Sequence, residues 1–189
     1  MNNKGSLIVV SGLSGAGKGT MMKRLLEKHP DEYALSISAT TRDPRPGETH
    51  GKEYFFISKD EFEKMIAEGK LLEHASYVGH YYGTPREWVE EQMESGRNVI
   101  LEIDIQGGLQ IKEIMPDAML VFILPPSMEE LRRRLEGRGS ETPEEIQKRL
   151  DRAEEEKNFI DRYNFVIINE DVEKSVDLLH NTILAKNRD

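Results

Sequence analysis

Apolar residues occur along the chain in short continuous runs, separated by longer amphipathic stretches. The runs cover residues 7–10, 99–103, 119–124 and 165–168, with a shorter piece at 35–38. Continuous runs, as opposed to alternating apolar and polar residues, are typical of parallel strands that are covered on both faces. The pattern therefore predicts an α/β fold in which helices flank a parallel sheet.

Several helix starts are marked by capping boxes, in which a Ser or Thr and a Glu three residues later bond each other's backbone. The matching segments are residues 58–61, 84–87, 127–130 and 142–145, the last with Pro143 at the first helical position. Gly69 and Gly96 stand where helices are expected to end.

Two regions depart from this alternation. Residues 42–82 contain EYFFIS and LLEHASYVGHYYGT, aromatic-rich runs broken by polar residues, as in a half-exposed antiparallel sheet. We interpret this region as an insertion beside the main sheet. Residues 137–142 form an irregular stretch between two predicted helices, flanked by arginines, and this stretch is expected to move.

Composition narrows the class of protein. The 189 residues suit one domain, and a net charge of −9 argues against a general nucleic-acid binder. No apolar run approaches the roughly 20 residues of a membrane span, and the N-terminal run is too short for a secretory signal. The absence of cysteine excludes disulfides and fits a reducing compartment. We expect a cytoplasmic protein that binds neither nucleic acid nor membrane, with its oligomeric state left open.

Residues 6–20, SLIVVSGLSGAGKGT, combine an apolar strand, a glycine-rich loop and a helix start. Gly12, Gly15 and Gly17 allow successive backbone N–H groups to point at phosphate oxygens, beside the positive end of the helix. Lys18 can reach the β- and γ-phosphates. The alternative is an ordinary glycine-rich turn, but the buried strand before it and the amphipathic helix after it are what the phosphate motif requires.

Position 19 departs from the usual motif, because Gly19 replaces the hydroxyl residue that normally binds Mg²⁺. Either Thr20 contributes a ligand weakly, or the ion is held mainly by nucleotide oxygens and water, which Mg²⁺ accepts readily. The sequence GAGKGT resembles the loop of adenylate kinases and related nucleoside monophosphate kinases, in which this glycine is normal.

Residues 36–54 suggest a second anion site. Arg42 and Arg45 are three apart in a loop stiffened by two prolines. With the hydroxyls of Ser38 and Tyr54, the two guanidinium groups could hold a monophosphate; the alternative is a solvated basic loop.

The wider signature resembles guanylate kinases. It reads SATTRDPRPGE at residues 38–48 and GKEY at 51–54, and the resemblance continues through LLEHASYVGHYYGTP, LEIDIQGG, FILPPS, RRRLEGRG, QKRL and VIINED over nearly the whole chain. It implies a phosphate-loop NTPase-type fold with a parallel five-stranded sheet, an inserted mixed or antiparallel GMP-binding subdomain and a small helical lid. Within one domain, it places the core at about 1–37, 97–126 and 155–189, the insertion at about 38–96 and the lid at about 127–154.

The resemblance also implies an activity and a set of residues. The reaction would be Mg²⁺-dependent transfer of the ATP γ-phosphoryl group to GMP, in line and without a covalent intermediate. The residues implied for ATP are Gly12, Leu13, Ser14, Gly15, Ala16, Gly17, Lys18, Gly19, Thr20 and Asn169. Those implied for GMP are Ser38, Arg42, Arg45, Tyr54, Glu73, Tyr82, Thr84, Glu102 and Asp104, and those for catalysis are Lys18, Arg134, Arg138 and Arg149.

Glu73 and Thr84 match the carboxylate and hydroxyl that read the guanine base in that family. Guanine offers N1–H and N2–H₂ as neighbouring donors for one carboxylate, whereas adenine offers no such pair and would leave the site unpaired. The residues alone also allow Glu73 to be an exposed strand carboxylate and Thr84 to be only a helix N-cap.

Glu102 and Asp104 follow an apolar strand, where phosphate-loop enzymes carry their metal-side acid. The family usually has Asp at the place of Glu102, so the partner of each acid, acceptor or Mg²⁺, stays open. The alternative is a carboxylate that is satisfied at a strand end.

Six arginines surround residues 137–142: Arg132, Arg133, Arg134, Arg138, Arg149 and Arg152. Planar, always charged guanidinium groups suit the transfer of a phosphoryl group. Arg132 and Arg133 are expected to be solvated, and the alternative for the others is pairing with Glu136, Glu144, Glu145 or Glu154. Glycines on both sides of Arg138 would let the loop fold over the nucleotide and exclude water.

Three other functions stay open. Another nucleoside monophosphate kinase would fit GAGKGT, although the R-x-P-R loop, Glu73 and Thr84 argue against it. A guanylate-kinase-like module that binds peptides typically lacks an intact phosphate loop, whereas Lys18 and the loop glycines are present here. A nucleotide-binding regulator without catalysis is the third.

Overall fold

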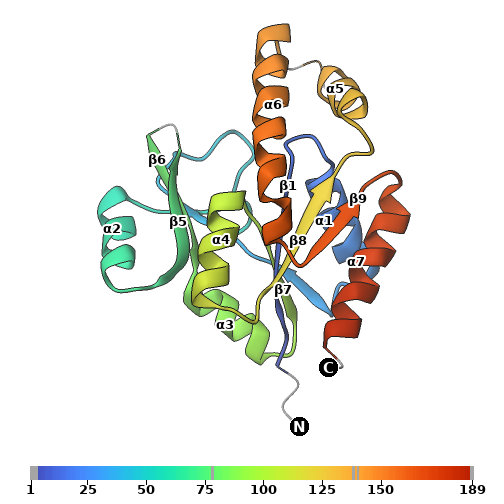
Figure 1. Ribbon diagram of the computed structural model, residues 1–189. Helices are drawn as coiled ribbons and strands as arrows, with labels where there is room; N and C mark the ends of the chain where they lie inside the picture. Colours follow the sequence, from blue (N-terminus) through green and yellow to red (C-terminus); the bar gives the residue numbers. More distant parts are fainter. Residues whose placement is uncertain (1–3, 78, 138, 140, 188–189) are drawn as a thin grey trace.

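The computed structural model describes residues 4–77, 79–137, 139 and 141–187. Its main sheet has five parallel strands in the order β2-β7-β1-β8-β9 (Figure 1). They are β1 (Leu7–Gly12), β2 (Tyr33–Leu35), β7 (Asn98–Glu102), β8 (Met119–Leu124) and β9 (Phe165–Ile168). The parallel five-stranded sheet predicted from the apolar runs is confirmed, and the central strands are almost fully buried.

One strand lies earlier than predicted. The sequence favoured residues 35–38, but β2 spans Tyr33–Leu35 and pairs with β7. The Tyr33 ring is buried because its hydroxyl finds a partner, the Nδ1 atom of His180, at 2.8 Å.

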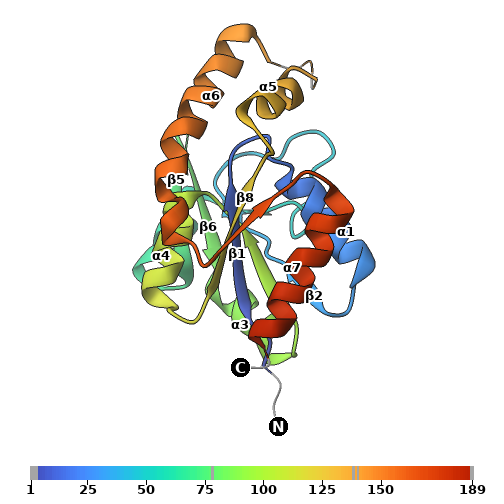
Figure 2. The ribbon, with the colours of Figure 1, turned by 45° about the vertical axis from the view of Figure 1, so that its right-hand side comes forward.

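Helices cover both faces of this sheet. On one face, α1 (Lys18–Lys28) and α7 (Val172–Lys186) lie side by side, and α4 (Ile105–Ile114) covers the other (Figure 2). Helix α3 (Arg86–Glu94) packs against β7 and buries Val89 and Met93 in the main core. It does so although it lies within the expected insertion range.

A second, mixed sheet has the strand order β4-β3-β6-β5. Its strands are β3 (Ala39–Thr40), β4 (Phe55–Phe56), β5 (Leu71–Tyr77) and β6 (His80–Pro85). Helix α2 (Lys59–Ala67) connects β4 to β5. Only β3 and β4 are parallel. This sheet has its own small core around Phe62, as expected for an inserted unit.

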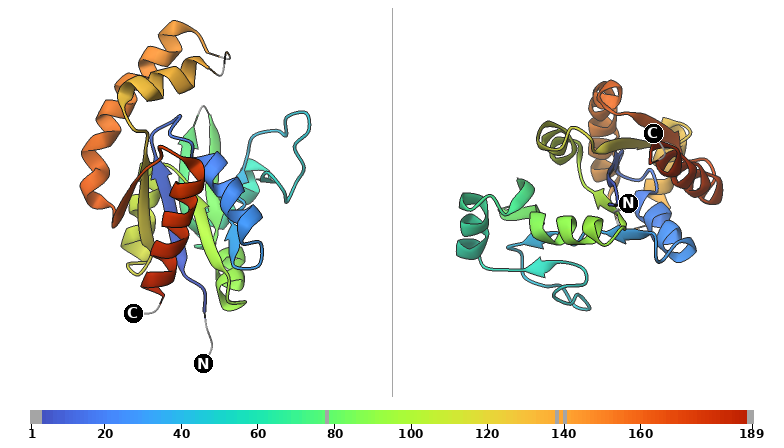
Figure 3. Two further views of the ribbon diagram at one scale, coloured as in Figure 1. Left: turned by 90° about the vertical axis from the view of Figure 1, so that its right-hand side faces the viewer. Right: turned by 90° about the horizontal axis from the view of Figure 1, so that it is seen from below.

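Helices α5 (Met128–Glu136) and α6 (Pro143–Glu156), followed by the 3-10 helix η1 (Lys157–Arg162), rise above one end of the main sheet. Figure 3 shows them on one side of this end, with the loop between β3 and β4 standing out on the other. Both chain ends lie at the opposite end of the molecule (Figure 1). In open α/β sheets, ligands bind beyond the carboxyl ends of the parallel strands, so the functional site is expected at that end of the main sheet.

The predicted helix ends agree with the structure at all but one position. Ser58, Ser127 and Thr142 cap α2, α5 and α6, and Gly69 and Gly96 hold positive φ angles just beyond α2 and α3. The capping box at residues 84–87 is wrong: the N-cap of α3 is Pro85, and its neighbour Thr84 donates its hydroxyl elsewhere. In the described part of the chain, no helix is both long enough and apolar enough to cross a membrane.

Candidate functional site

The glycine-rich loop joins β1 to α1. Gly12 has φ 150°, and a Cβ there would lie 2.2 Å from the carbonyl oxygen of Ile123. Gly17 has φ 95°, and its Cβ would lie 2.5 Å from the Nδ2 atom of Asn169. No side chain fits at either position, because Ile123 of β8 and Asn169, directly after β9, lie against the loop. Glycine is therefore required at both positions.

Lys18 opens α1 and folds back over the loop. Its Nζ atom donates hydrogen bonds to the carbonyl oxygens of Gly12 at 2.7 Å and Leu13 at 3.2 Å. Position 19 faces the end of β7, because a Cβ on Gly19 would lie 3.8 Å from the Oε1 atom of Glu102. Thr20 is exposed one residue further around the helix, and the structure brings Glu102 next to the position of the missing hydroxyl.

Arg149 reaches the loop from α6. Its Nη1 atom donates to the Ser14 hydroxyl at 2.6 Å, and its Nη2 atom pairs with the Glu141 carboxylate at 2.7 Å. The second oxygen of Glu141 is buried without a partner among the described residues. Arg149 is thus held over the phosphate loop by an acid that sequence reasoning missed.

Arg134 of α5 also contacts this loop. It donates to the carbonyl oxygens of Ala16 at 3.2 Å and Asn169 at 2.9 Å, and its Nε atom donates to Glu130 at 2.7 Å. Asn169 is buried and also donates to Ala16, at 2.8 Å. Arg134 and Asn169 therefore support the loop together. Arg138 lies outside the described residues.

The remaining arginines of this region form surface contacts. Arg132 and Arg133 are exposed, as expected, and Arg133 pairs with Glu130. Arg152 pairs with Glu156. The alternative partners Glu136, Glu144, Glu145 and Glu154 form no ion pair with the described arginines of this region, which pair with Glu130, Glu141 and Glu156. The i,i+4 spacing of Glu130–Arg134 and Arg152–Glu156 was the available signal.

Two cavities meet at the end of β7. One, of about 770 Å³, contains Gly12, Ser14, Lys18 and Arg149 in its wall. The other, of about 710 Å³, contains Glu73 and Tyr82. They share Tyr77, Glu102, Ile103, Asp104, Ile105, Arg152 and Glu156. The loop-side cavity and the cavity of the second sheet are therefore neighbours across one strand end.

Glu73 and Thr84 form a buried pair in the second cavity. The Thr84 hydroxyl donates to the Oε1 atom of Glu73 at 2.6 Å, and Glu73 is only 7% exposed. A register shift in β5 between Leu71 and His74 turns Glu73 inward. Burial raises the pKa of Glu73, and the charge of Asp104 raises it further. The alternative of an exposed strand carboxylate is wrong.

Arg42 and the two tyrosines Tyr54 and Tyr82 gather at the other end of the second sheet. The Arg42 guanidinium lies 5.4 Å from the centre of the Tyr54 ring, which meets the Tyr82 ring edge-on at 6.0 Å. Glu48 orders this cluster: it accepts from the Arg42 side chain at 2.9 Å and from the Arg45 backbone at 2.7 Å. Arg42 in turn holds the pKa of Glu48 below its usual range.

The other two residues expected to bind the acceptor phosphate are Arg45 and Ser38. The Arg45 side chain is exposed and makes no hydrogen bond or ion pair within the described residues, and Ser38 is half-buried. Glu48 was missed as a positioning residue. Its signal was its place in the signature, three residues after Arg45.

The two acids at the end of β7, Glu102 and Asp104, differ in their surroundings. Asp104 is the N-cap of α4 and accepts a hydrogen bond from the Gly107 backbone at 2.9 Å, so it is partly satisfied at the strand end. Glu102 faces the shared cavity wall. Desolvation by the surrounding protein raises the pKa of Glu102, while the positive charge of Lys18 opposes that rise. The loop lysine and this carboxylate are therefore electrostatic neighbours.

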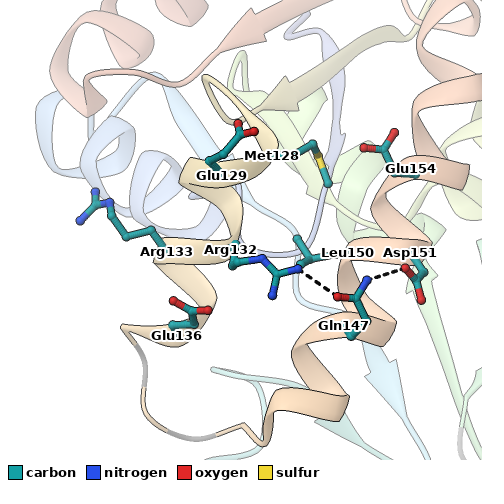
Figure 4. Close-up of a pocket in the computed structure, with 9 residues that line it drawn as sticks. All are labelled: Met128, Glu129, Arg132, Arg133, Glu136, Gln147, Leu150, Asp151 and Glu154. Atoms are coloured by element: carbon teal, nitrogen blue, oxygen red, sulfur yellow. Dashed lines mark hydrogen bonds between the residues drawn. The ribbon is translucent and has the colours of Figure 1, made fainter.

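A separate hollow of about 380 Å³ lies between α5 and α6, away from the phosphate loop (Figure 4). There Arg132 donates to Gln147 at 2.9 Å, and Gln147 donates to Asp151 at 2.7 Å. The first of these bonds joins α5 to α6, and the second lies within α6. None of the residues expected in the site lines this hollow.

Comparison with known proteins agrees with this geometry. A protein-family model described as guanylate kinase matches residues 4–186. A guanylate kinase from Caldanaerobacter subterraneus is 54% identical over 186 residues, which cover 98% of this chain and 90% of that protein. One from Clostridium perfringens is 53% identical over 185 residues, covering 98% and 85%. The crystal structure of guanylate kinase from Anaplasma phagocytophilum matches with a TM-score of 0.76 at 35% identity, covering 100% and 89%.

A glycine-rich loop at the head of a parallel sheet, beside a second cavity in an inserted sheet, defines a nucleoside monophosphate kinase of the phosphate-loop class. The match over almost the entire length then narrows the class. The chain belongs to the guanylate kinase family.

Proposed function

We propose that the protein transfers the γ-phosphoryl group of ATP to GMP, giving ADP and GDP, by in-line displacement without a covalent enzyme intermediate. The observation that supports it best is the shared wall of the two cavities at Glu102 and Asp104. A donor on the phosphate loop and an acceptor beside Glu73 would meet there, and holding both in line supplies much of the rate.

On the donor side, the loop residues 12–20 bind the ATP phosphates through backbone N–H groups and the start of α1. Lys18 leaves the loop carbonyls that it now contacts and moves to the phosphates, because a phosphate oxygen is the stronger acceptor. Asn169 and Arg134 support the loop and line the approach to the adenine.

On the acceptor side, Arg42, Arg45, Tyr54, Tyr82 and Ser38 bind the phosphate of GMP. Glu73 and Thr84 read the base. The ionised Glu73 carboxylate accepts from guanine N1–H and N2–H₂, which offsets the cost of keeping that charge buried.

Arg149, joined by Arg138 of the same lid, offsets charge on the transferred group. Arg149 already contacts Ser14 of the loop, so a small movement of α6 would carry it to the γ-phosphate. Closure of α5 and α6 would then exclude water and prevent hydrolysis of the donor.

Mg²⁺, when bound, neutralises charge on the β- and γ-phosphate oxygens. The residues present fit such an ion, because the Glu102 carboxylate faces Gly19 in the loop-side cavity and carboxylate oxygen suits a hard cation. We propose that Glu102, and more weakly Thr20, hold water of the ion, while nucleotide oxygens are its main ligands. A cytoplasmic location stays a prediction from the composition.

The test offers the purified protein each common nucleoside monophosphate with Mg-ATP and measures ADP release. GMP should be strongly preferred; release at background with GMP would refute the proposal, and a preference for AMP or UMP would refute the assignment of the acceptor site. Lys18→Ala should abolish transfer while GMP binding persists in calorimetry. Lys23→Ala, an exposed lysine of the same helix, is the matched control.

A further inference from the structure

A cluster of two histidines and a carboxylate lies on the face of the main sheet that α1 and α7 cover. His29 is the C-cap of α1, Glu32 follows in the turn that leads to β2, and His180 belongs to α7. Figures 1 and 2 show these two helices side by side. One ligand atom from each of the three residues can be chosen so that all lie within 4.8 Å of one another.

The ligand atoms of His29 and Glu32 are already spaced for an ion. The His29 Nδ1 atom lies 3.0 Å from the Glu32 Oε1 atom, and the backbone N–H of Glu32 donates to the carbonyl oxygen of His29 at 3.2 Å. Two ligands at about 2.0–2.1 Å from a tetrahedral Zn²⁺ lie roughly 3.3 Å apart. The turn thus presents a nitrogen and an oxygen at nearly the separation that a transition metal requires.

His180 carries the outer partner that metal-binding imidazoles usually have. Its Nδ1 atom lies 2.8 Å from the hydroxyl oxygen of Tyr33, which can accept a hydrogen bond from Nδ1–H. A hydrogen bond at one ring nitrogen fixes the ring and leaves the other nitrogen for an ion.

The two imidazoles are stacked, with centroids 3.8 Å apart and planes 13° from parallel. Each nitrogen lone pair lies in its own ring plane, so two parallel rings cannot both aim at one ion. Binding requires one ring to turn. His29 is the ring able to do so, because its only hydrogen bond within the described residues is with Glu32, itself a ligand.

The charges around the cluster favour a cation. Lys28 is the basic side chain beside His180, and it is paired with Asp177 of α7. The acids beside His180 are Glu32 and Asp177. Acids therefore outnumber bases, and a divalent ion would restore the balance.

We propose that His29, Glu32 and His180 form a binding site for a divalent transition metal such as Zn²⁺, with two imidazole nitrogens and one carboxylate oxygen as ligands and water completing the shell. Imidazole ligands distinguish this site from an oxygen-lined Mg²⁺ site. It lies at the opposite end of α1 from Lys18, so it is separate from the transfer chemistry. The ion would tie α7 to the junction of α1 and β2 and stabilise the native state.

The test titrates the full-length, nucleotide-free protein with Zn²⁺ in a calorimeter and with Co²⁺ in a spectrophotometer, both in excess Mg²⁺. We expect one equivalent bound, visible Co²⁺ bands of a four- or five-coordinate ion, and a higher Tm with Zn²⁺. His180→Gln and His29→Gln should each weaken binding by at least about 10- to 100-fold, the loss that follows removal of an outer-shell partner alone. His74→Gln, an exposed histidine outside the cluster, should leave binding unchanged.

Three results would overturn the proposal. These are no saturable binding, equal loss in His74→Gln and His180→Gln, or displacement of Co²⁺ by Mg²⁺. Should His180→Gln fail to fold because Tyr33 loses its partner, the exposed Glu32→Gln variant carries the test, since it leaves that bond intact. Unchanged Zn²⁺ affinity in Glu32→Gln and His29→Gln together would equally refute the site.

Discussion

The hydroxyl of Thr84 donates to the Glu73 carboxylate, 2.6 Å away, and both side chains are buried. Glu73→Gln removes the charge that accepts both guanine donors while keeping the shape. We expect kcat/KM with GMP to fall roughly 10- to 100-fold, since a hydrogen bond to a charged group is worth about 1.5–3 kcal/mol. KM for ATP should hardly change. Glu87→Gln, an exposed carboxylate on α3, is the control; equal losses for GMP and ATP would contradict the role of Glu73.

The same substitution should stabilise the protein at neutral pH. The pKa of Glu73 is raised in the native state, so its contribution to stability is most favourable below the ordinary value of 4.5 and is lost as pH rises through the raised value. At neutral pH the wild type carries a buried charge that Gln lacks. Thermal unfolding of the substrate-free proteins should give Glu73→Gln the higher Tm at pH 7, with a gap that narrows on acidification. A gap that widens would show the opposite pKa shift.

Arg149 should act mainly in the transition state. Arg149→Ala is expected to lower kcat by 10²-fold or more, by analogy with arginines that act on transferred phosphoryl groups, with a smaller effect on either KM. Arg133→Ala removes an exposed arginine of the adjoining helix and should leave kcat within about twofold of the wild type. Steady-state kinetics measures both. If the two variants lose kcat alike, the effect belongs to the lid's overall charge and not to Arg149.

Glu130 should matter for ATP through Arg134. Its carboxylate bonds Arg133 and Arg134, which lower the pKa of Glu130 to about 2, so it is ionised in any ordinary assay. Glu130→Gln should loosen Arg134 from the loop and raise KM for ATP several-fold, with KM for GMP unchanged. The neighbouring exposed Glu129→Gln is the matched control. Unchanged KM for ATP in Glu130→Gln would show that Arg134 is placed by Ala16 and Asn169 alone.

The metal dependence should follow Glu102 more than Thr20. Glu102 faces position 19, whereas Thr20 is exposed and its hydroxyl forms no hydrogen bond within the described residues. We expect Glu102→Gln to raise the Mg²⁺ concentration needed for half-maximal activity, and Thr20→Val, which removes the weaker of the two contacts, to change it less than about twofold. Activity measured against free Mg²⁺ at fixed ATP tests both. A larger effect in Thr20→Val would make its hydroxyl a direct ligand.

The strands and helix starts that were predicted correctly are features that depend on residues close together along the chain. Apolar runs identified the parallel strands, and local capping patterns identified most helix starts, because both signals are contained in a few consecutive residues. The role of Thr84 was not visible in this way. Its segment satisfied a capping box, but pairing of β5 with β6 placed a buried carboxylate within its reach, and the hydroxyl bonds that acid instead.

The positions of the arginines were harder to predict for the same reason. Family resemblance identified Arg134 and Arg149, but not the acids that hold them. Glu130 lies one helical turn from Arg134 and could have been paired by spacing, whereas Glu141 precedes α6 and meets Arg149 through the folding of the connection between two helices. Glu48 likewise reaches Arg42 only because the loop closes on itself.

The carbonyl of Ala16 receives hydrogen bonds from Arg134 and from Asn169, which is 153 residues further along the chain. During synthesis the phosphate loop leaves the ribosome well before the residue that backs it. A nascent or truncated chain that stops before β9 would carry every glycine of the motif and still lack the contacts that shape the loop. Nucleotide binding would thus report on whether translation has passed Asn169.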